Sequence, residues 1–397
     1  MKIALFTDTY LPQLNGVAVY LGDAIIELTK RNNVILFAPG EGPLRVEQKS
    51  ENFKIYWIPS APFPFYDGYR VATMDYKKIS AILKKEAPEI VHAHAPINLG
   101  LQGLLAAKRR RIPTVVTYHT HFPEYVPHLL KGKLPKVFDH LSQTAVKKMI
   151  KYVFRKVDVV TAPTEELVRE LRSYGLNNVT YLPNGIDFNK LKCEPKRIEH
   201  FRKQNNIPRN KKTIVYLGRI SFEKKLDQVL RAFKEIENRD RMLLVVGGGP
   251  YIKNFKGLAD ELGIKNIIFT GFVKSESVGA AYSCGDIFVS ASDTETFGLT
   301  FVEGMYMGLP AIGVNRLGAK EVISDGKTGL LVEPGDVKEL ASAMDRLLED
   351  NKLRKKMATA AKKRAEAYSI ENSVKGTLNV YKQIITKTGR KISGQKT

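Results

Sequence analysis

The chain has few cysteines and no long hydrophobic run. Its 397 residues include only Cys193 and Cys284, which cannot build a disulfide framework and fit a reducing compartment. No apolar run approaches the roughly 18–20 residues that span a bilayer. The N-terminal stretch MKIALFTDTY makes a poor secretory signal, because it carries Asp8 and a single lysine. We therefore expect an intracellular chain that is not integral to a membrane.

Acidic residues are also scarce relative to basic ones. Asp and Glu total 41 against 63 Lys and Arg, which gives a formal net charge of +22. This excess favours an anionic partner, such as nucleic acid, an anionic lipid surface or a phosphorylated substrate. The bases of the first half match no recognised nucleic-acid-binding module, so we expect no nucleic-acid partner.

Three phosphate-related motifs are incomplete. VVGGGPYIKN has Ile252 where a dinucleotide fingerprint needs its third glycine. DGKTG resembles the end of a phosphate-binding loop, but Glu321 stands where the earlier glycine is required. The chain also contains no Asp-x-Asp motif.

What is present is an alternation of short apolar strands and amphipathic helices, which predicts α/β folding around parallel, doubly wound sheets. In the first half the expected strands are KIALFTD, NVILFAP, FKIYWIP, EIVHAHA, IPTVVTYHT, VDVVTAP and NVTYLP. After a polar, basic passage the pattern restarts with TIVYLGR, MLLVVGGG, NIIFTGF, DIFVSAS and PAIGV.

This repetition predicts two Rossmann-like domains. We expect the first over residues 1–187, completed by a C-terminal helix at 370–386, and the second over 188–369. Residues 387–397 form a basic tail that we expect to be flexible. Ligands of open α/β sheets lie outside the carboxyl ends of the strands. Two facing sheets would therefore place the chemistry in an interdomain cleft.

The stretch SASDTETFGLTFVEG, residues 290–304, contains the strongest candidate site. Glu295 follows an expected strand, and the amides of Phe297, Gly298 and Leu299 begin a helix, where unpaired N–H groups suit an anion. Glu303 lies about one turn further, within reach of a vicinal diol. A helix cap and an exposed glutamate would give the same local pattern.

Two other stretches supply phosphate-binding candidates. In YLGRISFEKKLDQVL, Arg219 follows a strand and Lys224 precedes a helix, so this basic pair can neutralise a diphosphate. Solvent-exposed bases have the same pattern. In DTYLPQLNGVAVYL, Gly16 joins the first strand to the first helix, where a phosphate can approach the backbone.

Together these motifs resemble the retaining glycosyltransferases of family 4, which have the GT-B fold. The resemblance rests on the arginine and lysine of GRISFEK, on VVGGGP and YLPNGID, and on ETFGLTFVE and GLPAIGVNRLGAKEVISDGKTGLLVEPGD. It covers nearly the whole chain. The family pattern has glycine where this chain has Lys225, which leaves open whether Lys224 or Lys225 faces the phosphate; the register favours Lys224.

The resemblance implies a role for each matching residue. Glu295 contacts hydroxyls of the donor sugar, Glu303 holds the ribose, and His119 binds the hexose. The diphosphate is bound by Arg219, Lys224 and the amides of Phe297, Gly298 and Leu299; Gly16 closes over it, and the backbone around Val273 meets the base. We take His119, Glu295, Arg219 and Lys224 as catalytic, with no cofactor and no metal required.

Four histidines, His92, His94, His119 and His121, support a second hypothesis. They end two neighbouring expected strands, and imidazole is a common zinc ligand, so a metal-dependent hydrolase is the alternative from another class. A structural role for His92 and His94 is the other interpretation.

The wording of TYHTHFPEYVP and TETFGLT resembles lipid-directed members of the family, including diacylglycerol glucosyltransferases and sulfolipid synthases. The basic segment 136–156 has an apolar face with lysines opposite, which suits either an anionic bilayer or a core-facing helix. The residues of that face, at helical spacing, are Phe138, Leu141, Ala145, Met149, Tyr152 and Val153. Expected membrane contacts are Phe63, Phe65, Tyr66, Lys147, Lys148, Lys151 and Arg155.

The prediction is transfer of a hexose, glucose from UDP-glucose, to a membrane lipid such as diacylglycerol. Its partners are a nucleotide sugar, an anionic membrane surface and the lipid acceptor. We expect the enzyme in the cytoplasm, bound peripherally to the inner face of the cell membrane. A soluble sugar or polysaccharide acceptor is the alternative within the family.

Overall fold

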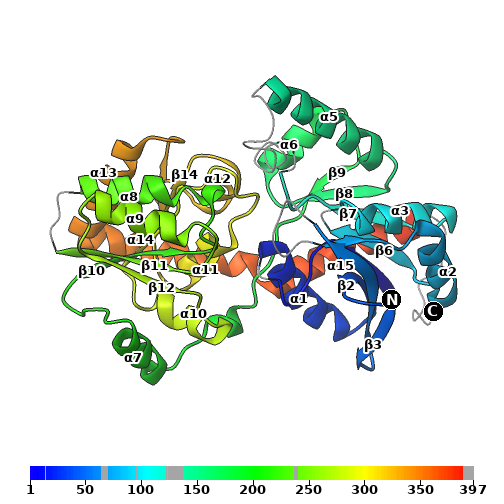
Figure 1. Ribbon diagram of the computed structural model, residues 1–397, viewed down its shortest axis with the longest axis horizontal. Coiled ribbons are helices and arrows are strands. Elements are labelled where there is room, and N and C mark those ends of the chain that lie inside the picture. Colours follow the sequence, from blue (N-terminus) through cyan, green and yellow to red (C-terminus); the bar gives the residue numbers. More distant parts are fainter. Residues whose placement is uncertain are drawn as a thin grey trace. The chain divides into compact units, whose positions relative to one another are not determined.

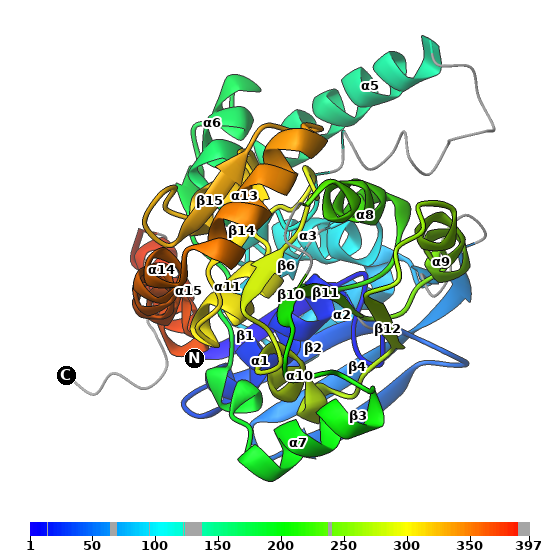
Figure 2. The same cartoon turned by 90° about the vertical axis from the view of Figure 1, so that its left-hand side faces the viewer.

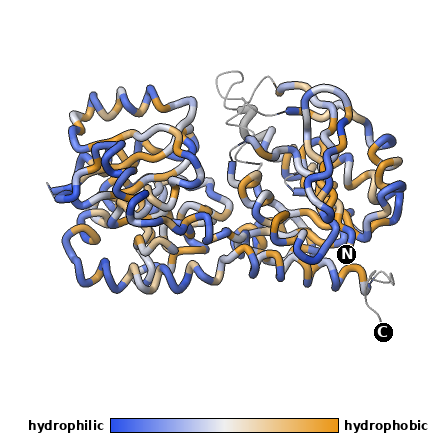
Figure 3. Tube along the Cα trace, turned by 90° about the horizontal axis from the view of Figure 1, so that it is seen from below, coloured by the Kyte–Doolittle hydropathy of each residue, from blue (hydrophilic) through white to orange (hydrophobic). Residues whose placement is uncertain are grey.

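The computed structural model describes residues 1–13, 15–63, 70–94, 96–121, 123, 137–236 and 240–387, with the backbone alone for 137–141. The chain divides into two compact units (Figure 1). Unit 1 comprises Met1–Gly185 together with the segment that starts at Ile370, and unit 2 comprises Ile186–Ser369. Hydrophobic segments run through the interior of each unit (Figure 3).

In its described residues, unit 1 holds a nine-stranded sheet with the order β3-β4-β2-β1-β6-β7-β8-β9, and β5 pairs with β4. Neighbouring strands are parallel, except that β3 and β5 run antiparallel to β4. The strands are β1 (Lys2–Thr7), β2 (Asn33–Gly40), β3 (Arg45–Ser50), β4 (Phe53–Pro62), β5 (Arg70–Ala72), β6 (Ile90–His94), β7 (Thr114–Thr117), β8 (Val159–Ala162) and β9 (Val179–Tyr181).

Helices connect these strands, as the parallel pairing requires. They are α1 (Gly16–Thr29), α2 (Tyr76–Glu86), α3 (Leu99–Arg109), α5 (Val137–Phe154), α6 (Glu165–Ser173) and α15 (Ile370–Lys387). The last of these returns from the far end of the chain and packs on α1 (Figure 1). Its buried residues Val374, Thr377 and Tyr381 fall at helical spacing, which explains why it lies on the unit rather than in solvent.

Unit 2 is built on a six-stranded, fully parallel sheet with the order β12-β11-β10-β13-β14-β15. Relabelled within the unit this is 3-2-1-4-5-6, the order of a Rossmann sheet. The strands are β10 (Lys212–Leu217), β11 (Arg241–Val246), β12 (Ile267–Gly271), β13 (Ile287–Val289), β14 (Ala311–Val314) and β15 (Gly329–Val332).

Helices cover both faces of this sheet. They are α7 (Pro195–Gln204), α8 (Leu226–Glu235), α9 (Ile252–Glu261), α10 (Ser275–Tyr282), α11 (Leu299–Tyr306), α12 (Leu317–Val322), α13 (Val337–Glu349) and α14 (Asn351–Ala365), with short 3₁₀ turns η1 (Phe188–Leu191), η2 (Phe222–Lys224) and η3 (Glu366–Tyr368). Alternate residues of β10 point to opposite faces. Ile214 and Tyr216 join a core with α8, α9 and α13, whereas Val215 joins a core with α10, α11 and α14.

The structure differs from the sequence prediction in several elements. Strands β3, β5 and β15 and helix α7 were not predicted, and β7 ends at Thr117, before His119. The α/β architecture with parallel, doubly wound sheets is confirmed.

Candidate active site

The candidate residues of unit 2 lie where the strand order of its sheet reverses. Strand β10 pairs with β11 on one side and with β13 on the other. From β10 the chain continues to β11, whereas from its neighbour β13 it continues to β14, in the opposite direction across the sheet. This switch point is where open α/β sheets bind ligands. Arg219 and Lys224 follow β10, and Glu295 follows β13, so the three residues come from its two sides.

Lys224 and Glu295 are paired across the switch point. The Lys224 Nζ lies 2.5 Å from Glu295 Oε1, and the two side chains keep 25% and 20% of their exposure. The neighbouring Lys225 points instead to Asp293, with 3.5 Å between Nζ and Oδ2. Of the two lysines that the sequence left open, Lys224 is therefore the one that shares a site with Glu295.

Lys225 has a backbone conformation that glycine adopts more easily. Its φ is +52°, in the left-handed region, where it ends η2 and precedes α8. A side chain is disfavoured there because its Cβ crowds the backbone. This gives a physical reason for the glycine of the family pattern. The change of direction also separates Lys224 and Lys225, which pair with different carboxylates.

Helix α11 begins at this site without a side-chain cap. Its N-cap is Gly298, at φ +77°, and a Cβ built there would lie 2.6 Å from Phe301 Cδ2. Glycine is thus required by both conformation and packing. The preceding Phe297 is buried and holds the turn in place, with its ring edge-on to Tyr368 at 5.4 Å.

Glu303 lies one turn into α11, and its carboxylate accepts a hydrogen bond from a tyrosine. Tyr282 donates to Glu303 Oε2 at 2.8 Å. No motif in the sequence points to Tyr282, because a buried tyrosine at the end of a helix has no distinctive pattern around it. Val273 follows β12 and packs, partly buried, against the same core.

In unit 1, His119 belongs to a buried histidine cluster made of His92, His94 and His119. The Nε2 of His119 lies 2.9 Å from His94 Nδ1, and these two rings stack at 5.2 Å. His92 bonds through Nδ1 to Tyr381 of α15 at 2.6 Å and through Nε2 to Thr117 at 2.7 Å. All three side chains are at most 4% exposed.

Burial lowers the pKa of His92 and of His119 to about 3, and it lowers that of His94 well below the usual value. The cluster is therefore neutral at physiological pH. His94 Nδ1 and His119 Nε2 bond to each other, and the two nitrogens of His92 bond to Tyr381 and Thr117. In the described part of the chain no group of three His, Cys, Asp or Glu side chains has the geometry of a metal site. His121 lies apart, 2.8 Å from Glu170.

In unit 1, by contrast, a carboxylate occupies the start of the corresponding helix, α3. Asp8, which follows β1, is 2% exposed. It accepts hydrogen bonds of 2.6–3.3 Å from the four amides at the start of α3, those of Ile97, Asn98, Leu99 and Gly100. The anion-binding end of α3 is thus filled by the protein itself, in contrast to α11. Gly16 is exposed and begins α1, which Asn15 caps.

The expected membrane residues are described only in part. Phe65 and Tyr66 lie outside the described residues, and Phe63 is half-buried. Lys147, Lys148, Lys151 and Arg155 are all exposed on α5 or directly after it. Figures 1 and 2 both draw α5 at the periphery of its unit.

The predicted apolar face of α5 was wrong at three positions. Ala145 is exposed, and Met149 and Tyr152 keep 43% and 57% of their exposure. Ile150 and Phe154 are the buried residues, because their spacing of four places them against the sheet. Met149 and Tyr152 therefore share the solvent side with the bases. Val153, a fourth predicted position, is half-buried, and the last two, Phe138 and Leu141, have no described side chains.

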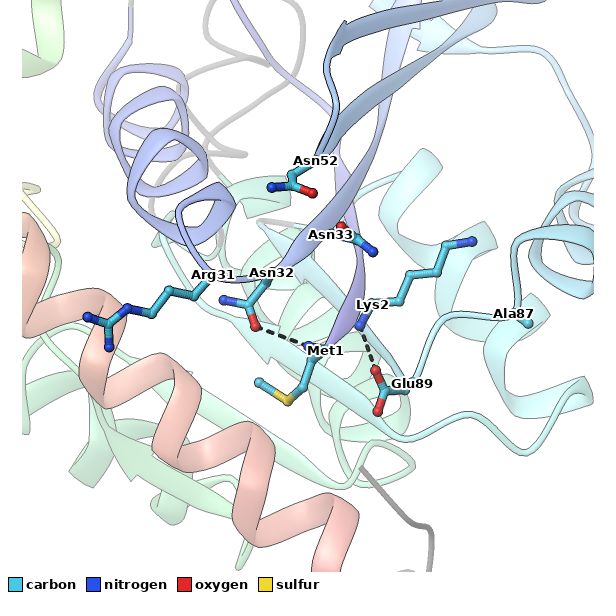
Figure 4. Close-up of a pocket in the computed structure, with 8 residues that line it drawn as sticks. All are labelled: Met1, Lys2, Arg31, Asn32, Asn33, Asn52, Ala87 and Glu89. Atoms are coloured by element: carbon cyan, nitrogen blue, oxygen red, sulfur yellow. Dashed lines mark hydrogen bonds between the residues drawn. The ribbon is translucent and has the colours of Figure 1, made fainter. Parts of the chain in front are cut away.

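A cavity of about 480 Å³ lies at the other end of the unit 1 sheet (Figure 4). It is formed where β1, β2, β4 and β6 begin and is lined by Met1, Lys2, Arg31, Asn32, Asn33, Asn52, Ala87 and Glu89. Ligands of parallel sheets bind at the opposite, carboxyl ends.

No helix in the described residues is apolar and long enough to cross a membrane.

Two family models match the chain. The model for glycosyltransferase family 4 matches residues 14–190, and the model for glycosyl transferases group 1 matches residues 197–364. A relative from Streptococcus pneumoniae, an alpha-monoglucosyldiacylglycerol synthase, is 34% identical over 83% of this chain and 75% of its own length. The sulfoquinovosyl transferase SQD2 of Arabidopsis thaliana is 27% identical over 85% of this chain and 64% of its own length.

Solved structures show the same fold. Sucrose-phosphate synthase from Thermosynechococcus elongatus has a TM-score of 0.77 at 19% identity and covers 97% of this chain and 99% of its own. HepE of Anabaena, solved with UDP-glucose, has a TM-score of 0.75 at 19% identity, over 96% and 100%. The two family models and the 34% identical relative replace the hydrolase alternative. The chain belongs to glycosyltransferase family 4, has the GT-B fold with two Rossmann-like domains, and is a nucleotide-sugar-dependent glycosyltransferase.

Proposed function

We propose that the enzyme transfers glucose from UDP-glucose to a membrane lipid such as diacylglycerol. The observation that carries the donor half is the Lys224–Glu295 pair at the switch point of unit 2, beside a helix start that no side chain caps. The lipid half is supported by the 34% identical relative, whose name describes a glucosylated diacylglycerol. HepE, solved with UDP-glucose, supports the choice of donor.

In this proposal the donor extends along the carboxyl edge of the unit 2 sheet. Arg219, Lys224 and the amides at the start of α11 hold the diphosphate, Glu295 holds the sugar hydroxyls and Glu303 holds the ribose. The base meets the backbone at Val273, and the family resemblance assigns Gly16 to the diphosphate and His119 to the hexose. When the donor binds, the Lys224–Glu295 ion pair opens. Lys224 then contacts the diphosphate, and Glu295 contacts the sugar hydroxyls.

The reaction we propose is a front-face displacement with retention. The bond from the anomeric carbon to the diphosphate oxygen breaks, and the acceptor oxygen bonds to that carbon on the same face. The acceptor proton passes to the departing phosphate oxygen. Arg219, Lys224 and the α11 amides stabilise the leaving charge, a role in which one lost donor typically costs on the order of 10²–10³ in rate. These bases replace a metal in the proposal.

A donor and acceptor screen tests this function. Purified enzyme is offered UDP-, GDP- and ADP-sugars, with and without anionic liposomes that contain diacylglycerol, and with a chelator in parallel. We expect glucose transfer from UDP-glucose that requires the liposomes and survives the chelator. Several relatives are GDP-mannose-dependent mannosyltransferases, so a GDP-mannose reaction would change the donor. Transfer to soluble sugars alone would refute the lipid acceptor, and loss with the chelator would refute metal-free transfer.

The acceptor half also requires the enzyme to reach a bilayer. The exposed bases of α5, together with Met149 and Tyr152, form a cationic amphipathic surface that suits anionic lipid. We place this contact on the cytoplasmic face of the cell membrane. Each base near an anionic surface contributes about 1 kcal/mol.

Reversing three of these charges tests the contact. The variant Lys147→Glu/Lys148→Glu/Lys151→Glu is expected to weaken binding to anionic vesicles on the order of 100-fold, measured by co-sedimentation at low salt. The matched control reverses three exposed lysines of α14 in unit 2, Lys352, Lys355 and Lys356, and should change binding much less. Equal losses in both variants would show that total charge, and not α5, attracts the vesicles.

A further inference from the structure

Tyr282 is a fully buried tyrosine whose hydroxyl ends at the candidate donor site. It is the last residue of α10, is 0% exposed and packs its ring on Phe288 of β13 at 5.9 Å. Burying a hydroxyl away from water is costly unless it forms a hydrogen bond. A phenylalanine would fill nearly the same volume without that cost. The hydroxyl therefore matters through the hydrogen bond that it forms.

The hydroxyl is directed at Glu303. It lies 2.8 Å from Glu303 Oε2 and 3.3 Å from the carbonyl oxygen of Thr300, one turn earlier in α11. One proton serves both acceptors, and the shorter contact goes to the carboxylate. Burial, the charge of Glu303 and the hydrogen bond raise the pKa of Tyr282 well above its usual value. The hydroxyl therefore stays protonated and is a permanent donor.

Glu303 itself is only half-buried, so its carboxylate lies at the boundary between the core and solvent. A glutamate there has three rotatable bonds, and ordering them when a ligand arrives opposes binding. The bond from Tyr282 fixes one carboxylate oxygen before the ligand is present. The donor of this bond belongs to α10 and its acceptor to α11, so the geometry depends on two packed helices instead of on the glutamate alone.

We propose that Tyr282 is a positioning residue that orients Glu303 toward the ribose of the donor and so sets the preference for ribose over deoxyribose. The inference rests on the proposed function, in which Glu303 accepts hydrogen bonds from the ribose diol. Tyr282 touches no substrate in this proposal and acts through Glu303.

The test compares nucleotide affinities of Tyr282→Phe with those of the unmodified enzyme. UDP, GDP and their 2′- and 3′-deoxy analogues are titrated by calorimetry. We expect the variant to bind the preferred ribonucleotide about tenfold more weakly and the deoxy analogues almost unchanged. KM for the nucleotide sugar should rise by a similar factor, with kcat within about twofold. The expected size is that of a lost hydrogen bond to a charged group.

Two further variants separate the possible outcomes. Tyr368→Phe removes another buried tyrosine hydroxyl in unit 2, one that bonds to the Glu321 carbonyl oxygen, and should leave the ribose preference intact. Glu303→Gln should abolish the preference, and adding Tyr282→Phe to it should have little further effect. Equal weakening of ribo- and deoxynucleotides by Tyr282→Phe would overturn the inference. A preference that survives Glu303→Gln would instead overturn the ribose assignment.

Discussion

Glu295→Ala is expected to lower kcat for sugar transfer on the order of 10²–10³, the usual effect of losing a polar contact made in the transition state. In the proposal Glu295 binds hydroxyls of the sugar whose bond breaks. The same substitution leaves Lys224 without the carboxylate that it contacts at 2.5 Å. Because Lys224 then meets a diphosphate without first leaving Glu295, affinity for free UDP should stay equal or rise.

The neighbouring ion pair supplies the control. Asp293→Asn weakens the contact with Lys225, which lies beside the first pair and has similar exposure, and should keep transfer within a few-fold. His119→Ala is expected to reduce transfer as strongly as Glu295→Ala, with the fold intact by circular dichroism. Transfer is followed with radiolabelled donor, and near-normal rates in both Glu295→Ala and His119→Ala would refute the site assignment.

We expect the histidine cluster to make unit 1 sensitive to mild acid. The pKa of His92 and of His119 is lowered to about 3 in the folded chain, and that of His94 is lowered as well, whereas an unfolded histidine titrates near 6.5. As the pH falls through about 6.5, the three histidines therefore bind protons in the unfolded state but stay neutral in the folded state. From about pH 7.5 to 5.5 the free energy of unfolding should fall by roughly 1.4 kcal/mol per histidine, or roughly 4 kcal/mol for three.

Urea titrations followed by tryptophan fluorescence measure this loss in the right unit, because the only tryptophan of the sequence, Trp57, lies in β4 of unit 1. His92→Gln should be less stable than the unmodified enzyme at pH 7.5 but should lose about one third less on acidification. His200→Gln, which replaces an exposed histidine of unit 2, should not change the slope. If His92→Gln keeps the full slope, the cluster does not cause the acid sensitivity.

Much of the fold could be predicted because buried parallel strands leave a clear signal. Runs such as TIVYLGR and MLLVVGGG are apolar on both faces, and polar turns separate them from helices. The missed elements lack that contrast. Strand β3 is almost entirely exposed and polar, and α7 has Phe201 as its single buried residue, so neither resembles a core element. Strand β15 is a four-residue edge strand whose first residue is glycine.

The site could be predicted only as far as motif and strand order reach. Arg219, Lys224 and Glu295 follow the strands at the switch point, as their motifs indicated. Which lysine shares the site depends on the left-handed turn at Lys225, and the support of Glu303 depends on how α10 packs against α11. On α5 the helical spacing was predicted, but Met149 and Tyr152 were assigned to the wrong side, because spacing alone does not say which stripe meets the sheet.

The return of α15 to unit 1 sets an order of events during translation. A ribosome releases residues 1–185 first, yet Tyr381, which bonds to His92, and Ser373, which bonds to Tyr20, are made last. Unit 2 is one continuous segment and can finish folding as soon as it emerges. Unit 1, which begins to be synthesised before unit 2, is thus completed after it. Until α15 leaves the exit tunnel, His92 lacks its contact with Tyr381.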